Sequence, residues 1–302
     1  MSSVQVSHLN KTYGSLHAVK DFSFSASGGE ILALVGPDGA GKTSIFRAIC
    51  GLIDYDSGEI KIAGYDSSRE FEKIKPLLGY MPQTFSLYPD LSVEENLNFY
   101  AGIFGLKRPQ FNEKKKLLYQ FSGLELFHDR RAAALSGGMK QKLALSCALI
   151  HDPSVLMLDE PTTGVDPLSR QQFWDILKRL RKDGSTILVS TPYMDEVALS
   201  DRAILVHQGT KLAEGTPDEL IRQFSGRVYL AKVQPTTERM EKLKKIHGMV
   251  SRRFGSSIHM YPRWDTDISD FYDQLKLVGI MPDEIEPVSP DLEDVFIQLM
   301  GE

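Results

Sequence analysis

The sequence is poor in cysteine and has no long apolar segment. Cys50 and Cys147 are the two cysteines among 302 residues. Both lie beside apolar residues in segments that we expect to be helical, which favours buried, reduced thiols over a disulfide. No apolar run approaches the roughly eighteen residues of a membrane span, and residues 1–5 lack the basic and then apolar order of a signal peptide. These absences predict a cytosolic protein without redox chemistry.

An excess of positive charge is also missing. The net charge is −5, whereas a general nucleic-acid binder has a concentrated basic surface, so we expect no nucleic-acid partner. Short lysine groups within 114–116 and 242–245 lie among helix-spaced leucines. We interpret them as solvated helix faces, with contact to lipid headgroups as the alternative. The seven histidines are scattered without metal-ligand spacing, so no structural metal is assigned.

The chain does contain a phosphate-binding loop between an apolar strand over 30–35 and a helix over 43–50. The pattern G-x-x-x-x-G-K-[ST] is met by Gly36-Pro37-Asp38-Gly39-Ala40-Gly41-Lys42-Thr43. Its glycines let backbone N–H groups turn toward phosphates, Lys42 adds a positive charge, and the Thr43 hydroxyl is available to Mg²⁺. We assign the segment through Ser44 to ATP binding. The alternative is a glycine-rich turn with a solvated lysine.

A second motif places two carboxylates at the end of an apolar strand, Val155-Leu156-Met157-Leu158-Asp159-Glu160. Parallel strands deliver functional side chains at their carboxyl ends. Asp159 is therefore predicted to hold Mg²⁺ through its water shell, and Glu160, pointing the other way, to polarise an attacking water. The alternative is an acidic pair with no role beyond ending the strand.

A third motif opens a helix with small residues, Leu135-Ser136-Gly137-Gly138-Met139. A helix start exposes free N–H groups, and the glycines permit close backbone approach. We predict a second anion site at Ser136, Gly137 and Gly138, which the chain's own phosphate loop does not explain. The alternative is a simple N-cap.

These motifs in this order resemble the nucleotide-binding subunit of ATP-binding cassette transporters, over about residues 2–225. Two further positions match that family. Tyr13 matches the aromatic residue that stacks on adenine, and Gln83 matches the glutamine that senses Mg²⁺ and the attacking water. The stretch 163–166 resembles the loop that couples two sites. Met139 stands where the family signature usually has Gln, a variant that resembles drug and lipid exporter subunits.

The resemblance implies an α/β fold: a P-loop cassette with a mixed sheet, an antiparallel β subdomain and a helical subdomain at about 86–150. It also implies a head-to-tail dimer, either a homodimer or a heterodimer. In that dimer Ser136 and Gly138 of one subunit close on the γ-phosphate bound by Lys42 of the other. The other implied partners are transmembrane permease subunits, which would hold the protein at the cytoplasmic face of the membrane. Phe85 and Tyr88 are candidates for that contact, with ordinary packing as the alternative.

One departure lies two residues after the apolar strand 186–190. The family places there a histidine that contacts the γ-phosphate, and this chain has Pro192, which offers neither a side-chain donor nor an N–H. We expect Pro192 to start a helix instead. His207 is expected in a strand and does not replace the histidine. The main hypothesis is an ATPase subunit of an exporter, and the alternative is a slowly hydrolysing regulatory half of a heterodimer. A cassette protein of translation or DNA maintenance would show a tandem cassette or coiled-coil arms, which this sequence lacks.

A second domain is expected over 226–302, after a cassette domain of 1–225. Its pattern predicts a small α+β unit with a regulatory or dimer-supporting role. The expected strands are 227–233, 251–254, 257–261 and about 284–287, and the expected helices end near 246, span 268–278 and begin at 291. The closing segment 289–296 resembles the C-terminal tail of cassette subunits from bacterial drug exporters.

Overall fold

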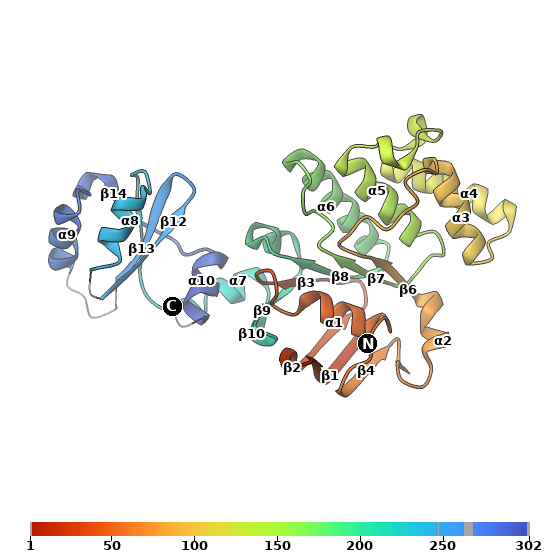
Figure 1. Cartoon of the computed structure of the whole chain (residues 1–302), viewed down its shortest axis with the longest axis horizontal. Helices are drawn as coiled ribbons and strands as arrows, with labels where there is room; N and C mark the ends of the chain where they lie inside the picture. Colours follow the sequence, from red (N-terminus) through yellow and green to blue (C-terminus); the bar gives the residue numbers. More distant parts are fainter. Residues whose placement is uncertain (1, 247, 263–267, 301–302) are drawn as a thin grey trace. The chain divides into compact units, whose positions relative to one another are not determined.

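The computed structural model describes residues 2–246, 248–262 and 268–300 (Figure 1). The chain divides into two compact units, Met1–Pro217 and Asp218–Glu302, and each is described by itself. This division falls earlier than the boundary at 225–226 predicted from the sequence. The reason is that the turn after α7 (Pro217–Ile221) is fastened to the second unit: the Ser225 N–H donates to the Gln298 side chain at 2.9 Å.

A six-stranded mixed sheet forms the centre of the first unit, in the order β10-β9-β3-β8-β7-β6. Its strands are β3 (Ile31–Val35), β6 (Leu78–Met81), β7 (Val155–Asp159), β8 (Thr186–Thr191), β9 (Arg202–His207) and β10 (Thr210–Gly215). The pairs among β9, β3, β8, β7 and β6 are parallel, and β10 is antiparallel to β9. The mixed sheet expected from the sequence is confirmed.

The inner strands of this sheet are buried on both faces, which explains why most of their positions are apolar. Alternate residues enter two different cores, because successive side chains of a strand point to opposite faces. Leu32 and Met157 pack on the side of α1 (Lys42–Ile49), whereas Ile31 and Leu156 pack on the side of the larger helices.

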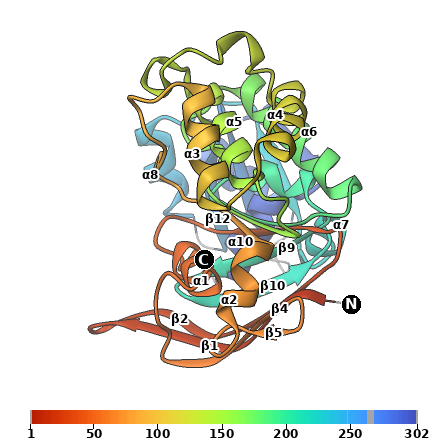
Figure 2. The same ribbon diagram turned by 90° about the vertical axis from the view of Figure 1, so that its right-hand side faces the viewer.

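An antiparallel sheet covers the far side of α1, in the order β2-β1-β4-β5 (Figure 2). Its strands are β1 (Ser2–Tyr13), β2 (Leu16–Ser27), β4 (Ser57–Ile62) and β5 (Tyr65–Asp66). Phe46 and Ile49 of α1 are completely buried between the two sheets. The predicted antiparallel β subdomain is therefore present, and it packs against the side of α1 that faces away from the central sheet.

Helices cover the other face of the central sheet, and three of them lie in the chain between β6 and β7. The helices are α3 (Val93–Ile103), α4 (Arg108–Ser122), α5 (Gly137–Ala148) and α6 (Pro167–Lys182). Shorter segments are α2 (Phe71–Ile74), η1 (Lys75–Leu77), η2 (Glu125–Phe127), η3 (Ala132–Ala134) and η4 (Met194–Leu199). Ser92 and Glu95 form a capping box at the start of α3, and Asp166 caps α6 ahead of Pro167. Local sequence thus fixes where these helices begin.

The second unit has a four-stranded antiparallel sheet in the order β12-β13-β11-β14. Its strands are β11 (Val228–Ala231), β12 (Met249–Phe254), β13 (Ser257–Pro262) and β14 (Ile285–Val288). Its other elements are α8 (Thr237–Leu243), α9 (Ile268–Leu277), η5 (Pro282–Glu284) and α10 (Leu292–Leu299). This α+β arrangement is the one predicted from the sequence. Across the described residues, every helix is too short or too polar to cross a membrane.

Candidate nucleotide-binding site

The phosphate-binding loop between β3 and α1 has glycines where a side chain would collide with neighbouring backbone. A Cβ on Gly36 would lie 2.1 Å from the Val206 carbonyl oxygen, and one on Gly41 would lie 2.3 Å from that of Ala18. Gly41 also has a φ of 104°, which other residues rarely adopt. The loop can therefore keep this path only with glycine at both positions.

The start of α1 is left open for an anion. Its N-cap is Gly41, so no side chain caps this end of the helix. The Gly41 carbonyl oxygen accepts from the Ile45 N–H at 3.1 Å, which is the first hydrogen bond of the helix. The N–H groups of a helix start carry a partial positive charge. Residues 37–39 form the exposed tip of the loop, Ala40 is buried beneath it, and Ser44 is half-buried. The described geometry presents the first turn to a phosphate group.

Lys42 is buried under the loop, with 3% of its surface exposed. Its Nζ donates to the carbonyl oxygens of Gly36 at 2.7 Å and Pro37 at 3.1 Å. The same atom lies 3.3 Å from Oε1 of Glu160. The ammonium group thus joins the phosphate loop to the acidic end of β7, two motifs far apart in the sequence.

Asp159 faces α1, because alternate residues of a strand point to the same face and Val155 and Met157 of β7 pack on that side. Its Oδ1 accepts from the Thr43 hydroxyl at 3.2 Å and from the Ser190 hydroxyl at 2.6 Å. Its Oδ2 is buried and has no hydrogen-bond partner among the described residues. Burial raises the pKa of this carboxyl, and the two hydroxyls act in the opposite direction. A buried carboxylate oxygen without a partner beside a threonine hydroxyl suits a hard cation such as Mg²⁺.

Glu160 is held on three sides. Its Oε2 accepts from Gln83 Nε2 at 2.8 Å and from the Thr163 hydroxyl at 3.3 Å, and its Oε1 faces Lys42. Its backbone φ of 49° lies in the left-handed region, which costs a non-glycine residue energy. The structure therefore brings together five predicted residues from three segments: Lys42, Thr43, Gln83, Asp159 and Glu160.

The remaining predicted residues lie apart from this cluster of contacts. Tyr13 is 43% exposed, and the Lys11 ammonium lies 5.0 Å from its ring centroid. Ser136 is exposed at the N-cap of α5, where its hydroxyl accepts from the Met139 N–H at 3.3 Å. The glycine at 138 also has a packing reason that sequence reasoning missed, since a Cβ there would lie 2.6 Å from the side chain of Ser169.

The expectation that Pro192 starts a helix is wrong. The following helix is the 3₁₀ segment η4, and its N-cap is Tyr193. The reason is a competing network: the Thr191 hydroxyl accepts from the Tyr193 N–H at 3.1 Å and donates to Glu196 at 2.6 Å. Glu196 is buried and also accepts from Thr162 at 2.7 Å. These contacts fix the chain on both sides of Pro192.

An apolar groove of ≈ 430 Å³ lies beside the segment that carries Gln83. Its lining includes Met81, Tyr100 and Phe104, with Cys50 and Cys147 deeper in the wall. The predicted contact residues Phe85 and Tyr88 are 37% and 46% exposed but do not line it. Tyr88 instead packs edge-on against Phe99 at 4.6 Å between ring centroids.

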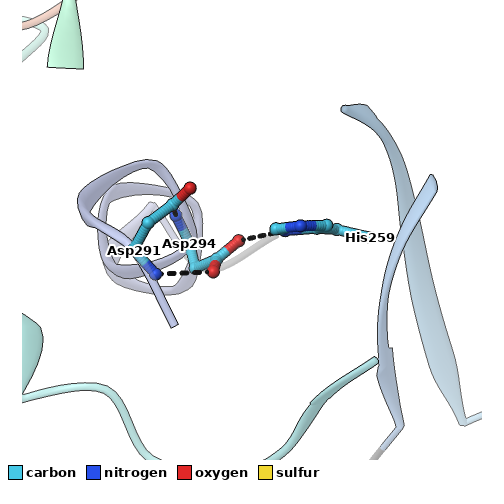
Figure 3. Close-up of side chains that lie close together, drawn as sticks. All are labelled: His259, Asp291 and Asp294. Carbon is cyan, nitrogen blue, oxygen red and sulfur yellow. Dashed lines mark hydrogen bonds and ion pairs between the residues drawn. The ribbon is translucent and has the colours of Figure 1, made fainter. Parts of the chain in front are cut away.

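A separate buried cluster in the second unit joins β13 to α10 (Figure 3). Oδ1 of Asp294 accepts from the Tyr261 hydroxyl at 2.7 Å and lies 2.9 Å from Nδ1 of His259, and Oδ2 accepts from the Asp291 N–H at 2.8 Å. Sequence spacing does not reveal this proximity. Because the protein itself satisfies both Asp294 oxygens, we interpret the cluster as a helix cap that fastens α10.

Comparison with known proteins gives consistent findings. The family model described as ABC transporter matches residues 19–163. The Nod factor export ATP-binding protein I of Bradyrhizobium diazoefficiens is 35% identical over 97% of this chain and 94% of its own length. The probable multidrug ABC transporter ATP-binding protein YbhF of Escherichia coli is 41% identical over 73% of this chain, which spans only 38% of that relative's length.

Solved structures show the same fold. A structure described as the ATP-binding subunit of an ABC transporter matches with a TM-score of 0.67 and 31% identity, over 74% of this chain and 93% of its own. A cassette described as a dimer in a post-hydrolysis state, bound to ADP and Pi, matches with a TM-score of 0.65 and 26% identity, over 70% of this chain and 98% of its own.

Proposed function

The chain belongs to the ABC transporter family as an ATP-binding ATPase cassette, and from this premise we propose that it powers export through separate membrane subunits. The observation that carries the proposal is the convergence of Lys42, Thr43, Gln83, Asp159 and Glu160 on one end of the central sheet. Ligands of α/β folds bind outside the carboxyl ends of parallel strands, where these residues lie.

For ATP, the loop from Gly36 to Ser44 supplies backbone N–H groups to the phosphates, and Lys42 supplies a positive charge. The lysine amine now donates to two loop carbonyls, which a phosphate oxygen would replace as the stronger acceptor. Tyr13 supplies a ring face to adenine, with the Lys11 ammonium nearby. Aromatic stacking and phosphate binding thus act on opposite ends of one nucleotide.

Thr43 and Asp159 would hold Mg²⁺, with Gln83 at its edge. The unpartnered buried oxygen of Asp159 supports this assignment. When bound, the ion would neutralise charge on the transferring phosphate. The protein's own contribution is to keep the carboxylate oriented, since the Thr43 and Ser190 hydroxyls hold one oxygen and leave the other without a partner among the described residues.

Glu160 is the proposed general base. Its carboxylate is positioned by Gln83 and Thr163 rather than left free to rotate, so it can accept a proton from a water in a fixed place. Gln83 lies in the segment beside the apolar groove. A change in that groove would therefore reach the base through one hydrogen bond.

We further propose that two cassettes close head to tail around ATP. Ser136 and Gly137 are exposed at the start of α5, whereas Gly138 is buried. The first N–H groups of a helix have no acceptor within the helix, so we expect those of Gly137 and Gly138, with the Ser136 hydroxyl, to meet the γ-phosphate of a partner. The similar cassette described as a dimer bound to ADP and Pi supports this arrangement. Either an identical or a different cassette can serve as the second subunit.

The membrane partner is proposed to dock at the apolar groove. Its ≈ 430 Å³ and aromatic lining suit one helix of a permease, and Phe85 and Tyr88 stand exposed close by in the sequence. Docking there would place the chain at the cytoplasmic face of a membrane. The relatives named for multidrug transport and Nod factor export favour export as the direction.

Pro192 supports a second candidate, a slowly hydrolysing regulatory half of a heterodimer. Proline supplies no donor where the family has a histidine, so transition-state charge is less well stabilised. The second unit is proposed to support dimer formation or regulation, since the phosphate-contacting residues assigned above all precede it.

The test contrasts Lys42→Ala with Glu160→Gln. Lys42→Ala should weaken ATP binding, because it removes a charge that faces the phosphates, whereas Glu160→Gln should retain binding, lose turnover and accumulate an ATP-bound dimer. Affinity is measured by titration with a fluorescent ATP analogue, and the dimer by size-exclusion chromatography.

A matched control is Lys61→Ala, which removes a surface lysine of β4 whose partner is the exposed Glu59. It should leave both affinity and turnover unchanged. If Glu160→Gln hydrolyses ATP as fast as the parent chain, Glu160 is not the base. If the parent neither binds nor hydrolyses ATP, the proposed function is wrong.

A further inference from the structure

Ser190 is a polar residue directly after the apolar run Ile187-Leu188-Val189 of β8. β8 lies between β3 and β7, and the Ser190 side chain is completely buried there. A buried hydroxyl costs free energy unless it both donates and accepts a hydrogen bond. Its two partners therefore indicate what the residue does.

The first partner is the carboxylate of Asp159. The Ser190 hydroxyl donates to Oδ1 at 2.6 Å, closer than the 3.2 Å of the Thr43 hydroxyl on the same oxygen. A hydrogen bond to an ionised group is short and strong. It fixes the rotation of the carboxylate and leaves the other oxygen, Oδ2, buried and without a hydrogen-bond partner among the described residues, which suits a cation ligand.

The second partner is the backbone of Glu160. Its N–H donates to the Ser190 hydroxyl at 2.9 Å and to the Ser190 carbonyl oxygen at 3.1 Å. This peptide belongs to the residue whose φ of 49° is unfavourable for any side chain other than hydrogen. The shared bond therefore holds Glu160 in a strained conformation, which directs its carboxylate toward Gln83 and Lys42.

We propose that Ser190 is a positioning residue that sets both carboxylates of the site at once, the cation-holding Asp159 and the base Glu160. One hydroxyl carries both tasks, since its single proton goes to Asp159 and its lone pair to Glu160. Ser190 touches neither nucleotide nor water in this account. The inference rests on the proposed function and extends it to a residue outside the motifs found in the sequence.

The experiment compares Ser190→Ala and Ser190→Cys with the parent chain. Supporting groups behind metal ligands typically contribute about 10- to 100-fold to metal affinity or activity, so Ser190→Ala should lower kcat by about that factor. ATP affinity in EDTA should stay within about twofold, because the phosphate loop is unchanged, while the gain in affinity on adding Mg²⁺ should shrink. Ser190→Cys roughly keeps the volume of the side chain but donates a weaker hydrogen bond. Its kcat and its Mg²⁺ response should therefore fall between those of the parent and those of Ser190→Ala.

Ser146→Ala is the matched control. Ser146 is also a buried serine, and its hydroxyl donates to the Lys142 carbonyl at 2.8 Å within α5, so its loss perturbs packing without touching either carboxylate. It should leave kcat and the Mg²⁺ dependence of ATP affinity at the parent values. Melting temperatures of all variants separate folding from function.

The proposal is overturned if Ser190→Ala turns over and responds to Mg²⁺ as Ser146→Ala does. If Ser190→Ala does not fold, Ser190→Cys decides, and parental kcat and Mg²⁺ response in that variant would contradict the proposal. A parent chain that binds MgATP but shows no turnover would contradict the hydrolytic part of the proposed function. In that case the effect of Mg²⁺ on ATP affinity still tests the role of Ser190.

Discussion

Replacing Pro192 with histidine is expected to accelerate ATP turnover. The position lies beside the proposed phosphate-binding loop, because the carbonyl of the preceding Thr191 accepts from the Gly36 N–H at 3.3 Å. Flanking contacts from Thr191 to Tyr193 and Glu196 hold the backbone without help from the proline ring. An imidazole introduced there would meet a phosphate without rebuilding the segment.

The magnitudes favour a net gain. A polar contact made in the transition state contributes about 2–4 kcal/mol, or roughly 30- to 1000-fold in rate. Losing proline costs about 0.4–1 kcal/mol of stability, mainly by freeing the unfolded chain. The histidine contact acts on the activation barrier of hydrolysis, whereas the loss of proline acts on the folding equilibrium. A slightly less stable variant should therefore still turn over faster.

The assay is steady-state ATPase activity of the purified chain at saturating MgATP, with the melting temperature measured in parallel. Pro192→Ala is the control, since it removes the ring without adding a donor, and it should lower stability without raising the rate. Adding Glu160→Gln to Pro192→His should abolish the gain if both residues act on one phosphate. A parent that already turns over rapidly, with a histidine variant no faster, would refute the reasoning.

Two further predictions concern the second unit. A chain ending at Ser225 should bind ATP with nearly the parent affinity but dimerise more weakly, as measured by nucleotide titration and analytical ultracentrifugation; a large loss of affinity in a folded truncation would contradict this. Asp294→Ala leaves Tyr261 and His259 without their buried acceptor and should destabilise the second unit by about 2–4 kcal/mol in denaturant unfolding, while ATP affinity is unchanged. Asp273→Ala, at an exposed ion pair with Lys276, should have little effect by comparison.

Much of the fold and of the site could be predicted because the signals are local. The strand, the glycine turn and the helix around Lys42 are contiguous in the sequence. The apolar strand that ends at Asp159 can be predicted from its own residues alone. The small α+β unit followed from alternation and turn residues. What linked these segments was the resemblance to a family, since single-residue patterns do not give strand order.

The missed features all depend on contacts between distant residues. Ser190 lies 31 residues from Asp159, and His259 lies 35 residues from Asp294, so neither pair has a spacing that marks it. At Pro192 one local preference loses to another: proline suits a helix start, but the Thr191 hydroxyl accepts from Tyr193 and donates to Glu196, and Tyr193 is the N-cap. The distant part of that network is the contact of Glu196 with Thr162, which the sequence does not mark. The signal for Ser190 was present only as a polar residue directly after an apolar run.

The two cysteines give the apolar groove a chemical readout of its own. Cys50 and Cys147 are the only two thiols of the chain, and both line that groove. Burial raises the pKa of each thiol, so neither reacts readily with alkylating reagents while the walls are closed. Any labelling of the native chain therefore reports on one place. Reaction with a maleimide would require the walls of the groove to open, and a helix seated in the groove should slow that reaction further, which can be measured without the introduction of a single mutation.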